Sequence, residues 1–424
     1  MTVRSPHESQ APDPGQAPAD LPTPAQALER IRAAADVIGP HVVRTPTIPA
    51  HALSESVGAE VVLKLETLQR TGAFKLRGAL HKIFTLGEEE RGRGVIAASA
   101  GNHAQGVALS SKLVGCPATI VMPARTPAIK VDRTQGHGEH VEIVLHGAHY
   151  EEAYDRAVEL ARERGSTMVH PFDDLDVIYG QGTIALELVE QTAPLDTFLV
   201  PIGGGGLIAG IALALKALWP ETRVIGIQAE GASPMVESYR AGEIREVAHP
   251  TTIADGIKVG RVGHTTWPLV RDYVDECVTV DEEQIASAMV HGLEQLKLVT
   301  EGAGATALAA LLAGKVDPGE RCGVLLCGGN VDLNLIARVV ESGLANSGRY
   351  HRVHLRARDV PGTLQRITEV LTRNEVNILS IDHRRQGWTV PVGFVDVDIV
   401  LEVRNALQAS RLDADLRAEG FDVR

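Results

Sequence analysis

Short apolar runs alternate with longer helical stretches between about residue 93 and residue 228. Apolar runs rich in β-branched residues are typical of strands buried on both faces, and the stretches between them carry the period expected of helices. This alternation predicts an α/β fold with a parallel sheet covered by helices on both faces. The predicted strands are Val95–Ala98, Ala118–Met122, Val141–Leu145, Thr197–Ile202 and Arg223–Gln228, and the predicted helices are His103–Val114, Ala128–Thr134, Glu151–Glu163 and Leu207–Leu218.

The pattern changes after Leu344, where Ala345–Gly348 has the composition of a linker. The remaining elements follow the order β-α-β-β-α with a short last strand, which predicts a ferredoxin-like domain. Its predicted strands are Arg352–Ala357, Asn377–Asp382, Val390–Val403 and Phe421–Val423, and its helices are Thr363–Thr372 and Ala406–Ala418. We therefore expect a tail over 1–25, a catalytic domain over 26–345 with a small subdomain at about 95–172, a linker over 346–350 and a domain over 351–424.

Composition narrows the class of protein. A chain of 424 residues has room for two or three domains. A net charge of −13 argues against nucleic acid or an anionic membrane as a partner. Four scattered cysteines fit neither a disulfide framework nor a zinc template. Residues 1–24 lack an apolar signal segment, and Leu207–Trp219 is too short to span a bilayer, so we expect a cytoplasmic protein.

A run of four glycines, Gly203–Gly206, stands between a predicted strand and a predicted helix. Free N–H groups at a helix N-terminus favour an anion, and glycine allows a phosphate to approach the backbone closely. A tight turn rarely needs four glycines. The spacing from Gly204 through Gly206 to Ala209 also satisfies a permissive dinucleotide motif, but this turn lies mid-chain rather than in an opening βαβ unit.

A second strand-to-helix junction, Ser99-Ala100-Gly101-Asn102-His103, offers N–H groups, a hydroxyl and an amide donor that could hold a carboxylate. Taken alone, it is equally well an ordinary helix N-cap. Together with the glycine run it predicts two anion sites at the carboxyl edge of one sheet.

Lys75 lies in the run Thr71–Ala79, between small and apolar residues. Burial would lower the pKa of its amine and favour attack on an aldehyde, and Phe74 would be a flat partner for an aromatic ring. Cys327, which ends the apolar run before Gly328, is either a core thiol or the partner of a ring nitrogen. A lysine that forms a Schiff base and a phosphate cradle are together what pyridoxal 5'-phosphate requires.

Five motifs, TGAFKLRGA, SAGNHAQG, PIGGGGLIAG, TEGAGA and LCGGN, resemble in order and spacing those of the threonine ammonia-lyases, which are fold-type II pyridoxal-phosphate enzymes. The resemblance covers residues 26–345 and implies two three-layer subdomains, each with a parallel sheet. The tail from about residue 350 resembles an ACT domain through the segment Arg358–Leu364. One such module is typical of the medium-length form of the enzyme.

The resemblance implies a role for each matching residue. Lys75 would hold the cofactor and act as the base that removes the α-proton, and Phe74 would pack against the pyridine ring. Asn102 would bond the phenolic oxygen, and Cys327 would face the pyridine nitrogen. The phosphate would rest on Gly203, Gly204, Gly205, Gly206 and Leu207, and the substrate carboxylate on Ser99, Ala100, Gly101 and His103.

Some positions depart from the family pattern. Metal-dependent relatives have an acidic pair spaced by six residues; Glu230 matches the first member, but the second position is Val236, so we expect no metal site. Thr67 stands where relatives often have Asn or Asp, and Ala73 where many have Ser. Either change could alter the substrate preference.

The implied activity is elimination of ammonia from L-threonine, with L-serine as a poorer substrate. Serine racemisation and hydroxyaspartate elimination are the nearest alternatives, and a nicotinamide-dependent dehydrogenase or a non-catalytic amino-acid sensor are further ones. Residues Asp359, Pro361, Gly362 and Leu364 of the ACT-like segment would bind a branched-chain amino acid, or the module would serve only for dimerisation. We expect a homodimer or homotetramer.

Overall fold

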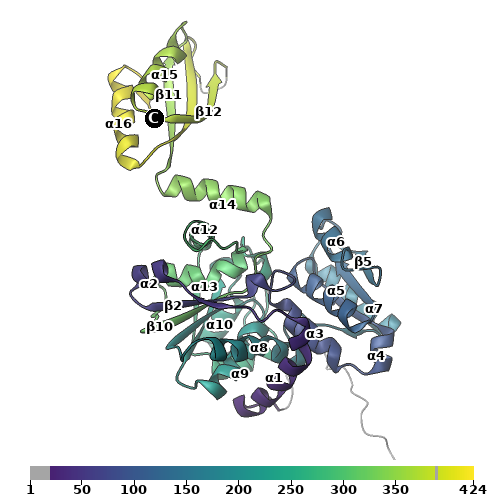
Figure 1. Cartoon of the computed structure of the whole chain (residues 1–424). Helices are drawn as coiled ribbons and strands as arrows, with labels where there is room; N and C mark the ends of the chain where they lie inside the picture. The colour runs from purple at the N-terminus through teal and green to yellow at the C-terminus, as the bar shows by residue number, and fades with distance from the viewer. Residues whose placement is uncertain (1–19, 387–389) are drawn as a thin grey trace, which may run out of the picture. The chain divides into compact units, whose positions relative to one another are not determined.

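A computed structural model describes residues 20–386 and 390–424 (Figure 1). The contacts divide the chain into two units, Met1–Asp332 and Leu333–Arg424. Most of the predicted tail, residues 1–19, lies outside the described residues. The first helix begins at Pro24 because the Thr23 hydroxyl accepts the Gln26 N–H, while the Gln26 side chain accepts the Thr23 N–H in return.

The larger sheet of the first unit has six strands in the order β1-β2-β10-β7-β8-β9. All neighbouring pairs are parallel except β1 with β2, which is antiparallel. Its central strands are almost wholly buried, as expected where helices cover both faces. The bounds are β1 (Thr47–Pro49), β2 (Glu60–Leu65), β7 (Thr197–Pro201), β8 (Arg223–Ala229), β9 (Glu276–Val280) and β10 (Arg321–Leu326).

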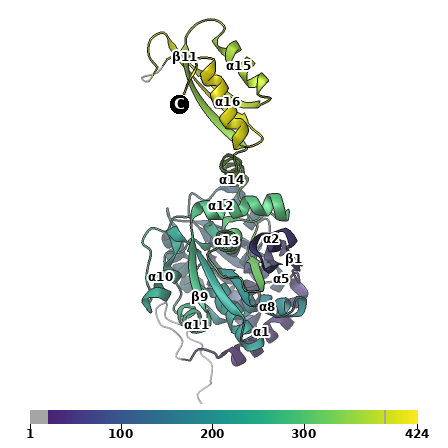
Figure 2. The ribbon, with the colours of Figure 1, turned by 90° about the vertical axis from the view of Figure 1, so that its left-hand side faces the viewer.

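Helices cover this sheet on both sides: in Figure 1, α12 and α13 lie above it, and α1, α8 and α9 lie below it. Figure 2 shows α11 on the same lower side as α1. Short helical turns connect several of the elements. The helices are α1 (Pro24–Ile38), α2 (His51–Val57), α3 (Lys75–Thr85), α8 (Leu175–Gln191), α9 (Gly206–Leu218), α10 (Pro234–Ala241), α11 (Thr266–Tyr273), α12 (Glu282–His291) and α13 (Gly302–Leu312). The turns are η1 (Gly39–His41), η2 (Glu66–Leu68), η3 (Glu230–Ala232), η4 (Asp255–Ile257) and η5 (Gly292–Leu296).

The smaller sheet of the same unit is fully parallel, in the order β5-β4-β3-β6. Its strands are β3 (Val95–Ala98), β4 (Ala118–Met122), β5 (Val141–Leu145) and β6 (Thr167–Met168), accompanied by α4 (Glu88–Arg93), α5 (Asn102–Val114), α6 (Ala128–Gln135) and α7 (Tyr150–Arg164). The predicted α/β class and the two parallel subdomains are confirmed. The prediction of both anion sites on one sheet is wrong, because β3 and β7 belong to different sheets.

The second unit contains a four-stranded antiparallel sheet in the order β12-β13-β11-β14. Its element order confirms the ferredoxin-like prediction, and its apolar residues form a separate core. The bounds are α14 (Leu333–Asn346), β11 (Tyr350–Arg358), α15 (Thr363–Arg373), β12 (Asn377–Arg384), β13 (Phe394–Glu402), α16 (Ala406–Ala418) and β14 (Asp422–Val423).

One predicted boundary in this unit is wrong. The strand expected to begin at Val390 begins at Phe394, because Gly393 adopts a φ of +86° and Pro391 offers no N–H to a ladder. Residues 387–389 lie outside the described part of the chain. Among the described residues, no helix combines the length and the apolar character needed to cross a membrane.

Candidate active site

Lys75 is the first residue of α3, and its amine is half-buried. The hydrogen-bond partner of this amine lies outside α3. The amine donates a hydrogen bond to the Pro171 carbonyl oxygen over 2.7 Å and lies 5.1 Å from the centroid of the Phe74 ring. Burial lowers the pKa of Lys75 to about 8, against the opposing influence of Cys327 and Glu301. A substantial fraction of the amine is therefore unprotonated near neutral pH.

The glycine run connects β7 to α9 and is packed tightly by protein on its outer side. Gly205 adopts a φ of +101°, which a residue with a side chain rarely adopts. A Cβ on Gly204 would lie 2.4 Å from the Phe172 ring, and one on Gly206 would lie 2.6 Å from the Phe172 carbonyl oxygen. Only glycine fits this turn, which leaves backbone N–H groups at the start of α9 without a side-chain cap.

The dipeptide Pro171–Phe172 brings the lysine and the glycine run together. The Pro171 carbonyl accepts the Lys75 amine, while the Phe172 ring packs against Gly204. His170 fixes the dipeptide, since its Nδ1 accepts the N–H groups of Phe172 and Asp173 at 3.2 and 2.7 Å. Burial lowers the pKa of His170 to about 4, so this ring nitrogen is free to accept. The sequence analysis did not identify this dipeptide.

The loop Ser99–Gly101 leads from β3 into α5, the helix of the smaller subdomain. The Ser99 hydroxyl accepts the Gly101 N–H over 3.2 Å, and α5 begins without a side-chain cap. Ala100 is half-buried, whereas His103 is 4% exposed and points away from the loop. The His103 Nε2 lies 2.8 Å from the Val169 carbonyl oxygen, and burial lowers the pKa of this ring to about 3. At this loop, therefore, His103 can offer an anion only its backbone.

Asn102 lies at the centre of a network that joins distant parts of the chain. Its Nδ2 donates to Glu301 over 2.6 Å, and its Oδ1 accepts from Asn330 over 2.8 Å. Asn330 Nδ2 also donates to the Thr71 carbonyl oxygen over 2.6 Å. Glu301 and Asn330 belong to the TEGAGA and LCGGN motifs, but no local pattern in the sequence assigns either residue a role. Their partners are 199 and 228 residues away along the chain.

Cys327 lies at the end of β10 and is 2% exposed. Its thiol donates weakly to the Ala303 carbonyl oxygen over 3.5 Å, and burial raises the pKa of the thiol well above its usual value. The Cys327 carbonyl accepts the Phe74 N–H, which ties β10 to the segment carrying Lys75. The thiol therefore remains neutral, as expected for a group that hydrogen-bonds a ring nitrogen without donating a full proton.

The residues that depart from the family pattern lie in different surroundings. Ala73 pairs with Gly328 in an isolated antiparallel bridge, and the buried Thr67 hydroxyl has no hydrogen-bond partner among the described residues. Glu230 lies exposed in η3, whereas Val236 is fully buried in α10. In the part of the chain that the structure describes, no three side chains gather in a metal-binding group.

The predicted effector residues lie in an exposed turn of the second unit. Asp359 pairs with Arg385 over 3.1 Å, and Gly362 adopts a φ of +92° immediately before α15. Pro361 and Leu364 are exposed. A role for this turn in binding stays a prediction.

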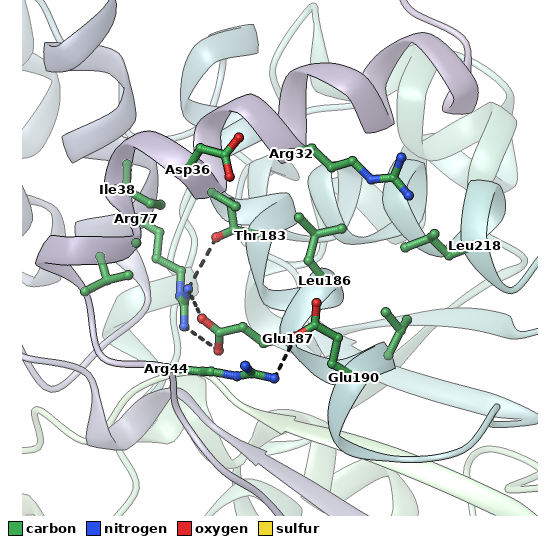
Figure 3. A pocket seen from close by; sticks show the side chains of 14 residues that line it. Arg32, Asp36, Ile38, Arg44, Arg77, Thr183, Leu186, Glu187, Glu190 and Leu218 are labelled. Atoms are coloured by element: carbon green, nitrogen blue, oxygen red, sulfur yellow. Dashed lines mark hydrogen bonds and ion pairs between the residues drawn. The ribbon is translucent and has the colours of Figure 1, made fainter.

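A pocket of about 540 Å³ lies elsewhere, between α1 and α8 (Figure 3). Arg77, two residues after Lys75, reaches its floor and pairs with Glu187 over 2.7 Å. The pocket contains none of the predicted site residues, although it borders a buried ionic network that includes Lys64 and Glu66.

Comparison with known proteins decides which ligand these features serve. Residues 38–328 match the family model described as "Pyridoxal-phosphate dependent enzyme". The chain belongs to this family. An L-threonine ammonia-lyase of Thermotoga maritima is 44% identical over 398 residues, covering 94% of this chain and 98% of that protein.

Two solved structures are similar to about three quarters of this chain. The processed form of threonine deaminase isoform 2 from Solanum lycopersicum has a TM-score of 0.71 and 36% identity, covering 78% of this chain and 93% of that one. Maize serine racemase has a TM-score of 0.70 and 39% identity, covering 75% of this chain and 98% of that one.

The geometry fits the cofactor of the family. The half-buried Lys75 amine has a lowered pKa, and the dipeptide Pro171–Phe172 contacts both this amine and the glycine turn. The helix that follows the turn begins without a side-chain cap. The family match favours the phosphate of pyridoxal phosphate over the dinucleotide interpretation of the same glycines. The chain is thus a pyridoxal-phosphate-dependent enzyme.

Proposed function

We propose that this chain is an L-threonine ammonia-lyase, with L-serine as a poorer substrate. The observation that carries the proposal is the 44% identity to such an enzyme across 94% of the chain. The arrangement of Lys75 beside Pro171–Phe172 and the glycine turn supports it, because one dipeptide contacts both the amine and the turn that would bind an anion.

Different residues bind the cofactor phosphate, the cofactor ring and the substrate carboxylate. Backbone N–H groups of Gly203–Leu207 bind the cofactor phosphate at the N-terminus of α9, with Thr266 holding the Gly204 carbonyl oxygen over 2.6 Å. Asn102 orients the ring through its second amide N–H, Phe74 supports one face, and the neutral Cys327 thiol faces the ring nitrogen. The uncapped N-terminus of α5, after Ser99, Ala100 and Gly101, takes the substrate carboxylate.

Bound pyridoxal phosphate supplies an aldehyde that captures an amine and a ring that delocalises negative charge from the substrate's α-carbon. The Lys75 Nζ would hold the cofactor in the resting enzyme and, as a free amine, would accept the α-proton of the substrate. Its lowered pKa makes the unprotonated form available at neutral pH. Loss of the proton and the β-hydroxyl, followed by addition of water, converts threonine to 2-oxobutanoate and ammonia.

The likeness to maize serine racemase makes racemisation the second candidate, since the two solved structures have nearly equal TM-scores. The match over nearly the whole chain favours the ammonia-lyase. Chiral analysis of products from serine, threonine and 3-hydroxyaspartate separates racemisation from the two eliminations. A non-catalytic sensor is opposed by the intact Lys75 and glycine turn.

The test is Lys75→Ala, compared with wild type and with the exposed-lysine variant Lys112→Ala. We expect Lys75→Ala to lose at least about 10²–10⁴-fold in threonine turnover, measured as 2-oxobutanoate release, because both the anchor and the base are removed. Lys112→Ala should match wild type. Threonine deamination by Lys75→Ala with retained visible absorbance of bound cofactor would overturn the assignment.

We propose further that the second unit binds a branched-chain amino acid at Asp359, Pro361, Gly362 and Leu364. The support is the position of this turn immediately before α15, where uncapped N–H groups favour a carboxylate. We also propose a homodimer or homotetramer in the cytoplasm. Four free cysteines, all buried, suit a reducing compartment.

A further inference from the structure

Glu301 is a half-buried carboxylate that the assigned chemistry does not use. It lies directly before α13, and its N–H donates to the Gly328 carbonyl oxygen over 3.1 Å. A Cβ on Gly328 would lie 2.2 Å from the Glu301 Oε1. The glycine after Cys327 therefore leaves the space that this carboxylate occupies.

The carboxylate sets the orientation of the Asn102 amide. An ionised carboxylate can only accept hydrogen bonds, so the Asn102 NH₂ group must face Glu301. The opposite side of the same amide accepts from Asn330, whose NH₂ group also donates to Thr71. If the Asn102 amide were reversed, its oxygen would face the carboxylate and its NH₂ group would face that of Asn330. Both contacts would then be unfavourable.

The charge of Glu301 is set by groups from several elements. Burial, together with Asp255 on η4, raises the pKa of Glu301 to about 7. The hydrogen bond from Asn102 and the charges of Lys130 on α6 and Lys75 on α3 oppose this rise. Asp255 and Lys130 lie 3.6 Å apart. Cys327, the remaining titratable neighbour, stays neutral. A protonated Glu301 would be able to donate, so the Asn102 amide would no longer be restricted to one orientation.

We propose that Glu301 is a positioning residue: its ionised form fixes the Asn102 amide and, through Asn330, the Thr71 end of the segment that carries Lys75. Protonation of Glu301 releases this network. The inference rests on the proposed function only in placing Asn102 against the cofactor, and it does not depend on which amino acid is the substrate.

The experiment compares the dissociation constant of pyridoxal phosphate for wild type and Glu301→Gln across a range of pH, using cofactor absorbance and no substrate. Glutamine keeps the shape of the side chain but cannot ionise. We expect Glu301→Gln to bind about tenfold more weakly than wild type at about pH 8, since a charge-assisted hydrogen bond is lost. At about pH 6 the two should bind equally, because Glu301 is then protonated. Because Glu301 also raises the pKa of Lys75, the titration of Lys75 is measured separately in the two proteins and its contribution is removed from the ratio.

Two neighbouring variants test the electrostatic cause. In a background of Asp255→Asn, the midpoint of the affinity ratio should move to lower pH, and with Lys130→Met it should move to higher pH. If Glu301→Gln bound the cofactor more weakly by the same factor at every pH, Glu301 would have only a structural role. If the two dissociation constants were equal at every pH, Glu301 would have no role in cofactor binding. If the wild type showed these shifts but did not turn over threonine, only the proposed function would be overturned.

Discussion

The reactivity of Lys75 follows from its surroundings rather than from its residue type. An ordinary lysine has a pKa of about 10.4 and is almost fully protonated at neutral pH. The Lys75 amine is half-buried, and its partner in the fold is the neutral Pro171 carbonyl rather than a carboxylate. Desolvation therefore dominates and lowers the pKa to about 8. A nucleophilic amine at physiological pH is the result.

This difference can be measured on the cofactor-free chain. We expect capture of an aldehyde by Lys75 to rise with a midpoint at about pH 8, because only the unprotonated amine attacks. The exposed Lys112 of the same chain serves as the internal reference. Trapping with borohydride, followed by peptide mass mapping, follows the two lysines in one sample. Identical pH profiles would show that burial does not activate Lys75.

At this scale, the sequence identified the residues whose chemistry is local. Gly203–Gly206 and Lys75 were predicted from strand-to-helix spacing and from neighbouring apolar residues. Phe172 and Glu301 were not, since each acts through a contact with a residue far away in the sequence. No short motif signals that Phe172 would press against Gly204. Only the packing of the two subdomains brings those residues together.

At the scale of elements, α8 holds the helix carrying Lys75 and the helix that follows the glycine turn. A Cβ on Gly180 of α8 would lie 2.6 Å from the Arg77 carbonyl oxygen of α3. A Cβ on Gly210 of α9 would lie 2.2 Å from the Ile178 carbonyl oxygen of α8. Backbone therefore meets backbone at both contacts, and side chains do not separate these helices.

A buried ionic network fastens α3 to the same helix. Arg77, fully buried, pairs with Glu66 over 2.8 Å and with Glu187 of α8 over 2.7 Å, and Lys64 pairs with Glu187 over 2.7 Å (Figure 3 shows the Arg77–Glu187 pair). Two cations and two anions thus balance in the interior. Removing one member leaves an uncompensated charge away from water.

We expect Arg77→Met to lower the free energy of unfolding by about 3–5 kcal/mol, because Glu66 then remains buried without its partner. The control is Arg164→Met, which removes the exposed pair with Glu142 and should cost no more than about 1 kcal/mol. Denaturant titration of both variants checks the difference. Equal losses would mean that the interior pair is no stronger than a surface pair.

Most strands were predictable because buried parallel strands have uninterrupted apolar runs with clear ends. The strand β13 was misplaced because apolar residues at 390 and 392 continued the pattern, while the backbone conformation of Gly393 ends it. The assignment of β3 and β7 to different sheets could not be inferred either. Strand order depends on long-range pairing that alternation alone does not encode.

At the scale of the whole molecule, the two units have separate cores, and some solved chains are matched by part of this chain alone. Maize serine racemase is matched over 98% of its length by only 75% of this chain. A protein of this fold therefore exists without a second unit like this one. We therefore expect the second unit to be separable from the chemistry.

We expect a chain ending at Asp332 to deaminate threonine within a few-fold of the full chain while losing any response to isoleucine or valine. Calorimetry should detect binding of a branched-chain amino acid only to the full chain. Equal heats from both chains would place the effector site in the first unit. Absence of binding to either chain would leave the second unit without a ligand and favour an assembly role.

The meeting of main chains at Gly180 and Gly210 also bears on how such enzymes diverge. The separation of α8 from its two neighbours depends on peptide geometry, which is the same in every sequence. Apolar residues elsewhere in the interior can therefore be exchanged over generations without altering the reach from Lys75 to the glycine turn. We therefore expect the spacing needed by the vitamin-derived ligand to tolerate wide changes in the surrounding sequence.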